Sequence, residues 1–177
     1  MNAGLAARHL VLMGLRGSGK STLGRLVAAR AGRGFVDLDD RTPVIMGFAS
    51  VAAAWEARGE SAFRAAEVEA LRAALAEPAG VIALGGGTPT APGAAELAKN
   101  SGCVLVYLRC SPAELRERLS QRGVGANRPS LTGKNPLDEI EEVFARRDPV
   151  YRALAGQVVE GITTPEGGVE RLLGLWK

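Results

Sequence analysis

The stretch LVLMGLRGSGKSTLGRL, residues 10–26, decides the fold that we expect for this chain. Its first four residues are apolar, as in a buried strand, and its last part places Leu23, Leu26 and Val27 at helical spacing. Between them lies a turn that holds three glycines within six residues. The pattern indicates a strand, a tight turn and a helix in direct succession.

The turn carries a recognisable phosphate-binding pattern. Gly14, Gly19, Lys20 and Ser21 have the spacing G-x-x-x-x-G-K-[ST]. The glycines let successive backbone N–H groups point at one phosphate, and the helix N-terminus adds partial positive charge. Lys20 would reach the β- and γ-phosphates, and the Ser21 hydroxyl would bind Mg²⁺. We therefore predict a site for ATP and Mg²⁺, made by Gly17, Ser18, Gly19, Lys20, Ser21 and Thr22.

Short β-forming runs recur along the chain and alternate with helical patterns. Continuously apolar strands of this kind are typical of a parallel sheet that helices cover on both faces, so the predicted class is α/β. The predicted strands are residues 9–13, 35–39, 81–84, 103–108 and 157–160. Predicted helices include residues 61–76 and three that start at the capping sequences of residues 111–114, 135–138 and 164–167.

Length and composition favour one soluble domain over residues 1–177. No apolar run approaches the roughly 20 residues that cross a bilayer, and the N-terminal segment leads into the first strand without a cleavage-site pattern. The formal charge is +3 without a dense basic run, so nucleic acid is not an expected partner. His9 is the only histidine, which excludes a catalytic triad. Cys103 and Cys110 suit reduced thiols of a cytoplasmic protein.

Two carboxylates follow the second predicted strand. Asp37 and Asp39 are two residues apart, so on a strand they would share a face, at the end where parallel sheets bind ligands. Asp37 would hold Mg²⁺ through water, and Asp39 would accept a proton from an attacking hydroxyl. Asp40 would point to solvent. Acidic residues are also common in ordinary strand-to-helix turns, which is the alternative interpretation.

Further candidates lie in three separate segments. The loop of residues 84–89, LGGGTP, lets the backbone of Gly85, Gly86 and Gly87 approach a ligand closely. Arg64 and Arg147 are candidate anion ligands, and Glu67 lies three positions after Arg64, where it would orient that guanidinium.

Residues 121–134, QRGVGANRPSLTGK, contain few apolar side chains and include Arg122 and Arg128. This composition predicts a loop outside the core. It is either a solvent-exposed connector or a mobile lid that closes over substrate.

At this point the sequence resembles the shikimate kinase family over nearly its whole length. The motifs GLRGSGKST, VDLD, GESAFRAAE, LGGGT, NRPSL and RRDPVYR occur in the family's order. The resemblance implies a three-layer α/β/α fold of the P-loop kinase type, with a five-stranded parallel sheet in the order 2-3-1-4-5. It also implies a lid at about 121–134, a substrate-binding helical segment at about 40–70, and a monomer.

The resemblance also implies a reaction, the ATP-dependent phosphorylation of the 3-hydroxyl of shikimate in chorismate and aromatic amino-acid biosynthesis. Arg64 and Arg147 would hold the carboxylate of shikimate. Asp39 and the backbone of residues 85–87 would hold its ring hydroxyls. Trp55 stands where the family usually carries phenylalanine in the shikimate pocket, which changes the expected shape of that pocket.

On the nucleotide side, the resemblance places Lys20 and Arg128 at the transferring phosphate, Ser21 and Asp37 at Mg²⁺, and Arg122 beside the adenine. Asp39, Lys20 and Arg128 would be the catalytic residues.

Two other classes of function stay open at this stage. One is a kinase of the same fold that acts on gluconate or a nucleoside monophosphate. The other is a non-catalytic nucleotide-binding module that has kept the fold for protein contacts.

Overall fold

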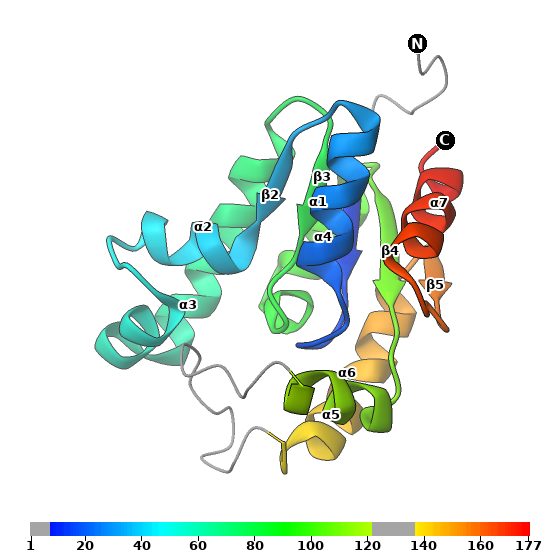
Figure 1. Cartoon of the computed structure of the whole chain (residues 1–177). Coiled ribbons are helices and arrows are strands. Elements are labelled where there is room, and N and C mark those ends of the chain that lie inside the picture. Colours follow the sequence, from blue (N-terminus) through cyan, green and yellow to red (C-terminus); the bar gives the residue numbers. More distant parts are fainter. Residues whose placement is uncertain (1–7, 122–136) are drawn as a thin grey trace.

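The computed structural model describes residues 8–121 and 137–177. Its sheet has five parallel strands in the order β2-β3-β1-β4-β5, which confirms the expected topology (Figure 1). The strands are β1 (Leu10–Met13), β2 (Phe35–Asp37), β3 (Val81–Ala83), β4 (Val104–Leu108) and β5 (Gln157–Val159).

Helices connect the strands and cover both faces of the sheet (Figure 1). They are α1 (Lys20–Ala31), α2 (Leu38–Ile45), α3 (Val51–Leu75), the 3₁₀ turn η1 (Thr88–Thr90), α4 (Ala94–Asn100), α5 (Pro112–Gln121), α6 (Ile140–Leu154) and α7 (Pro165–Leu175).

Two of the three predicted helix starts are confirmed. Ser111 and Glu114 form the expected capping box at α5, where the Ser111 N–H donates to Glu114 at 2.7 Å and the Glu114 N–H to Ser111 Oγ at 3.3 Å. Thr164 caps α7 by accepting from the Gly167 N–H. The third prediction is wrong in position: residues 137–139 are a turn and α6 begins at Ile140, while residues 135 and 136 lie outside the described ranges.

The helix predicted at residues 61–76 is longer than expected. It starts at Val51 and is interrupted at Gly59, whose φ of 75° is outside the helical region. The sequence pattern missed the first part because VAAAW has no clear apolar face. The kink divides α3 into two pieces, and the second supplies Ala70, Leu71 and Ala74 to the core.

Alternate residues of the central strand supply two separate cores. Val11 and Met13 belong to the core under α3, α4 and α6, whereas Leu10 and Leu12 belong to the core under α1 and α7. All four are fully buried. Of the three apolar residues at helical spacing in α1, Leu23 and Val27 pack in this second core, whereas Leu26 is 43% exposed.

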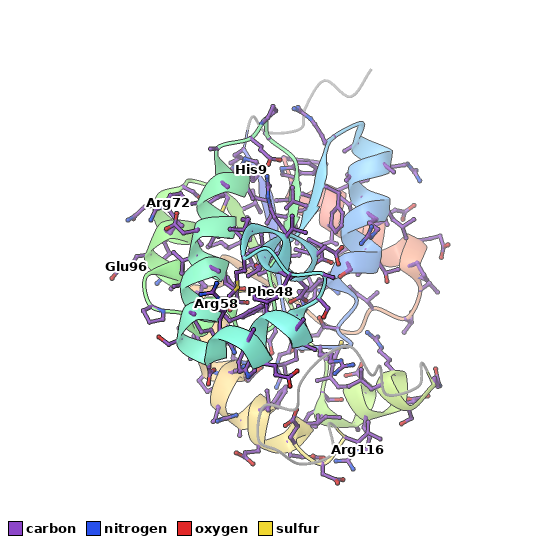
Figure 2. The ribbon with its side chains drawn as sticks, turned by 90° about the vertical axis from the view of Figure 1, so that its left-hand side faces the viewer. His9, Phe48, Arg58, Arg72, Glu96 and Arg116 are labelled. Carbon is purple, nitrogen blue, oxygen red and sulfur yellow. The ribbon has the colours of Figure 1, made fainter. Side chains whose placement is uncertain are left out.

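Many charged side chains lie on the outer surfaces of the helices. Figure 2 shows Arg72, Glu96 and Arg116 at the periphery of the ribbon, and all three are exposed. His9, just before β1, accepts the Gly80 N–H at Nδ1, so its Nε2 donates to the Glu77 carbonyl and ties the turn after α3 to the sheet. None of the described helices is both long and apolar enough to cross a membrane.

The strand order determines where a ligand can bind. The central strand β1 has β3 on one side and β4 on the other, so the connections diverge from its carboxyl end. In open parallel sheets such a switch point leaves a crevice that holds ligands. The loop that follows β1 is the glycine-rich turn of residues 14–19.

Candidate active site

The glycine-rich turn and the start of α1 form a phosphate-binding loop, residues 14–21. Gly19 is the N-cap of α1 with φ of 95°, and no side chain caps the first N–H groups of the helix. These donors therefore face the crevice, where a phosphate oxygen can accept them. The Lys20 ammonium is buried in the loop and donates to the carbonyls of Gly14 (2.8 Å) and Leu15 (3.2 Å).

The packing of this loop fits a phosphate group. A Cβ added at Gly14 would lie 2.6 Å from both the Leu108 carbonyl and Ser18 Oγ, so only glycine fits there. Ser18 is 2% exposed, and its hydroxyl has no hydrogen-bond partner in the described ranges. A buried hydroxyl without a partner beside uncapped N–H groups matches an anion that supplies the missing acceptor.

A small cavity, the loop cavity, opens beside the phosphate-binding loop. Gly17, Gly19 and Thr22 line it from one side and residues 162–165 from the other. Arg118 of α5 bridges the two sides, donating to the carbonyls of Ser18 (3.5 Å) and Ile162 (3.0 Å). Sequence reasoning missed Arg118, because nothing local distinguishes it from Arg116, the other arginine of α5.

Arg122 and Arg128, and residues 122–134 of the predicted lid, lie outside the described residues.

The two aspartates are not arranged as predicted. β2 ends at Asp37, and Asp39 lies in the first turn of α2, so they do not share a strand face. Asp37 is the N-cap of that helix and its Oδ1 accepts the Asp39 N–H at 3.0 Å. Both carboxylates still lie at the carboxyl end of the sheet, because the strand turns directly into the helix. Asp40 is exposed as expected and pairs with Arg25 at the surface.

A second cavity, the acceptor cavity, brings together the other predicted residues. Its walls come from the phosphate-binding loop, α2, α3, residues 86 and 87, α5 and α6. Asp39, Arg64 and Arg147 all line it, together with Gly86 and Gly87. Segments that are more than 100 residues apart in the sequence thus meet at one site, next to Leu15 and Arg16 of the phosphate-binding loop.

The Arg64 guanidinium is held on several sides. Its Nη1 donates to Glu67 at 2.6 Å, and its Nε and Nη2 donate to Glu60 at 3.3 and 3.2 Å. The ring of Trp55 lies 5.0 Å from its Cζ, a cation–π distance. A Cβ at Gly87 would overlap the guanidinium, so the glycine lets Arg64 lie against the loop backbone.

Glu67 is buried and confirms the orienting contact that the sequence predicts. Besides Arg64, it accepts the Thr88 hydroxyl at 2.7 Å. Burial raises the pKa of Glu67, and Arg64 and Thr88 offset part of that rise. The carboxylates of Glu67 and Asp39 both approach Gly85, where an added Cβ would lie 2.5 Å from Glu67 and 3.0 Å from Asp39.

Arg147 has a different environment. Burial lowers its pKa, and the positive charge of Arg64 lowers it further, although Tyr151 acts in the opposite direction. Within residues 8–121 and 137–177, no carboxylate forms an ion pair with Arg147. The Tyr151 hydroxyl, which donates to the Gly86 carbonyl, lies next to Arg147. A half-buried cation that no carboxylate of the described residues pairs with, beside a second guanidinium, suits an anionic ligand.

The comparison with protein families agrees with this geometry. The sequence model of the family described as shikimate kinase matches residues 16–174. A shikimate kinase of Thiobacillus denitrificans is 38% identical over 166 residues, covering 93% of this chain and 87% of that protein. A shikimate kinase 2 of Yersinia pestis is 38% identical over 167 residues, with 93% and 92% covered.

Solved structures give the same result. The shikimate kinase of Acinetobacter baumannii in complex with shikimate superposes with a TM-score of 0.87 at 29% identity, covering 98% of this chain and 94% of that one. The enzyme of Aquifex aeolicus gives 0.78 at 30% identity, with 94% and 95% covered. A gluconokinase of Sinorhizobium meliloti gives 0.63 at 17% identity over 96% and 91%, a likeness of fold alone.

Proposed function

The chain belongs to the shikimate kinase family, and on this premise we propose that the acceptor cavity binds shikimate while the phosphate-binding loop holds ATP. The reaction is transfer of the γ-phosphoryl group of ATP to the 3-hydroxyl, which yields shikimate 3-phosphate and ADP. One observation carries the assignment of the cavity: Arg64 and Arg147, from different helices, line it together with Leu15 and Arg16 of the phosphate-binding loop. Guanidinium groups bind a carboxylate with two parallel hydrogen bonds.

Each wall of the acceptor cavity has a role in binding. Arg147, which lacks a carboxylate partner among the described residues, receives the shikimate carboxylate, and Arg64 supports it from the side of α3. Asp39 and the backbone of residues 85–87 bind the ring hydroxyls. Trp55 and Phe63, whose ring centroids lie 5.4 Å apart, form an apolar wall for the ring.

The nucleotide end is formed by residues 17–22 together with Arg118. The uncapped N–H groups of α1 and the Ser18 hydroxyl bind the phosphates. The flat guanidinium of Arg118 lies along the loop cavity, where it stacks on the adenine. Ser21 and Asp37 would hold Mg²⁺, which neutralises developing charge on the phosphates when it is bound.

Catalysis rests mainly on position and charge. Asp39 accepts the proton of the 3-hydroxyl as that oxygen bonds to the γ-phosphorus, while the bond from this phosphorus to the β–γ bridging oxygen breaks. Lys20 stabilises the charge that accumulates on the transferring group. The apolar side chains of Leu115 and Leu119 close one side of the cavity and limit access of water, which competes as an acceptor.

We further propose that residues 1–177 act as one domain and as a monomer in the cytoplasm, with small molecules as its partners.

An acceptor panel tests the proposed function. ATP consumption is measured with shikimate, gluconate and nucleoside monophosphates, and the phosphorylated position is identified by NMR. Turnover with shikimate alone, phosphorylated at the 3-hydroxyl, is expected. Turnover only with another acceptor contradicts the proposed substrate, and ATP binding without any turnover indicates a non-catalytic module.

A further inference from the structure

Asp148 is a buried carboxylate that the proposed reaction does not use. It follows Arg147 in α6, is 9% exposed, and does not belong to the described lining of the acceptor cavity. It accepts hydrogen bonds from Tyr107 (2.9 Å), Arg109 (2.7 Å) and Arg152 (2.9 Å). Burial opposes its ionisation, but these bonds together lower its pKa below the ordinary value. Asp148 is therefore a charged anchor.

The main partner of this anchor comes from the sheet. Arg109 directly follows β4 and contacts α6 at two points one turn apart, the Asp148 carboxylate and the ring of Phe144, 5.0 Å from its Cζ. Its Nη1 also donates to Glu160, after β5, at 2.9 Å. Arg109 thus fixes one face of α6 against the carboxyl ends of β4 and β5.

The adjacent face of α6 carries the ligand-binding side chains. Arg147 and Tyr151 are four residues apart, as are Asp148 and Arg152, and successive residues of a helix point about 100° apart. Fixing the Asp148 face therefore fixes the direction of Arg147. Pro149 lies in the same turn of α6. A proline inside a helix removes one backbone hydrogen bond and weakens that turn, so the contacts of Asp148 stabilise a weak part of the helix.

A second contact links the anchor to the cavity. Tyr107, which donates to Asp148, packs edge-on against Tyr151, with ring centroids 5.2 Å apart at 85°. Tyr151 in turn contacts Arg147 and donates to the Gly86 carbonyl. The anchor, α6 and the glycine loop are thus in continuous contact.

We propose that Asp148, clamped by Arg109, is a positioning residue that sets the rotation of α6 and so aims Arg147 at the carboxylate of the acceptor. The inference rests on the proposed function, which assigns that carboxylate to Arg147. Asp148 itself touches no substrate and acts through its neighbour.

Steady-state kinetics of Asp148→Asn test the role. This variant keeps the shape of the side chain and removes its charge. The KM for shikimate is expected to rise about tenfold, while kcat stays within about twofold and the KM for ATP is unchanged. Glu141→Gln is the matched control, because it removes an exposed carboxylate of the same helix that pairs with Arg116 of α5 and not with Arg109. It should leave all three constants within about twofold.

A double-mutant cycle separates positioning from a general structural effect. kcat/KM for shikimate is compared among the wild type, Arg147→Ala, Asp148→Asn and the double variant. If Asp148 acts through Arg147, the second substitution causes little further loss once Arg147 is absent. Multiplicative losses overturn the inference and leave the proposed function intact, whereas an unchanged kcat/KM in Arg147→Ala contradicts both.

Tyr107→Phe provides a milder variant in case Asp148→Asn does not fold. It removes one of the three hydrogen bonds to Asp148. We expect about a threefold rise in the KM for shikimate, again lost in the Arg147→Ala background. The inference is overturned if Tyr107→Phe raises the KM by the same factor in the Arg147→Ala background, or if it does not raise the KM in the wild-type background.

Discussion

The two ends of the crevice are built in different ways. The phosphate-binding loop is one continuous stretch, and its binding groups are mostly backbone N–H groups, one lysine and one hydroxyl. The acceptor cavity is assembled from six segments, and its specific groups are side chains held by other side chains. A local pattern therefore encodes the first site, whereas the tertiary fold is needed to complete the second.

This difference predicts that substitutions at the two ends affect different kinetic constants. In the proposed function, groups at the phosphate-binding loop act on the transferring phosphoryl group, so their loss should lower kcat. The proposed groups of the acceptor cavity bind the non-reacting carboxylate, so their loss should raise the KM for shikimate.

The largest expected effect is that of Lys20→Ala. The ammonium lies within the loop, and its proposed role is to stabilise the charge that develops on the transferring phosphoryl group. Loss of one such electrostatic group lowers kcat by about 10²–10³-fold. The decrease should appear in kcat and kcat/KM alike, measured by ADP release at saturating shikimate.

Lys99→Ala is the control for this variant, since Lys99 lies in the last turn of α4 and is exposed. It should retain wild-type kinetics. A Lys20→Ala enzyme with near wild-type kcat and a raised KM for shikimate would reverse the assignment of the two ends.

The next effect in size is that of Arg147→Ala on acceptor binding. Loss of a desolvated charged contact costs about 2–5 kcal/mol, which corresponds to at least a tenfold rise in the KM for shikimate. kcat should change much less, because the carboxylate does not react. Arg146→Ala replaces the exposed neighbour and should bind shikimate normally. Equal KM values for both variants would remove Arg147 from the carboxylate site.

The sequence predicts the backbone site better than the side-chain site, for a physical reason. The spacing of Gly14, Gly19 and Lys20 directly determines the shape of the phosphate-binding loop, because the residues between them form a single turn. The strand order and the positions of Arg64 and Arg147 came from the resemblance of several motifs taken in order. The structure confirms the strand order, and it places Arg64 and Arg147 together in the lining of the acceptor cavity.

What the sequence did not predict depends on long-range contacts. Arg118 reaches Ile162, 44 residues away, and Tyr151 reaches Gly86, 65 residues away. The prediction that Asp39 shares a strand face with Asp37 is also wrong. The pattern FVDLD is typical of a continuous strand, whereas the chain turns into α2 after Asp37. The Asp37 side chain caps that helix. Asp37 could equally continue a strand, and local spacing does not distinguish the two conformations.

A smaller effect is expected for Trp55, which stacks on Arg64. The Arg64 side chain is only 12% exposed, and loss of a cation–π contact of about 1 kcal/mol should raise the KM for shikimate by about fivefold. Trp55→Leu removes the aromatic face, whereas Trp55→Phe keeps a weaker one. The KM values should therefore rank wild type, Phe and Leu in increasing order. Equal values for the two variants would show that the ring acts only through its volume.

The smallest effect concerns pH and Glu67, because Arg64 and Thr88 offset part of the burial that raises its pKa. A raised pKa means that the folded protein keeps this proton at a pH where the unfolded chain has released it. Its contribution to stability is thus complete below the unfolded value of about 4.5 and is lost as pH rises through the folded pKa. Urea unfolding between pH 4.5 and 8 should show the wild type losing stability relative to Glu67→Gln as pH increases.

Glu69→Gln, an exposed position on the same helix, should follow the wild type at each pH. Parallel curves for the wild type and Glu67→Gln would show that Arg64 fully compensates the burial of this carboxyl group, and that the acceptor end is as insensitive to pH in this range as a site built from backbone donors.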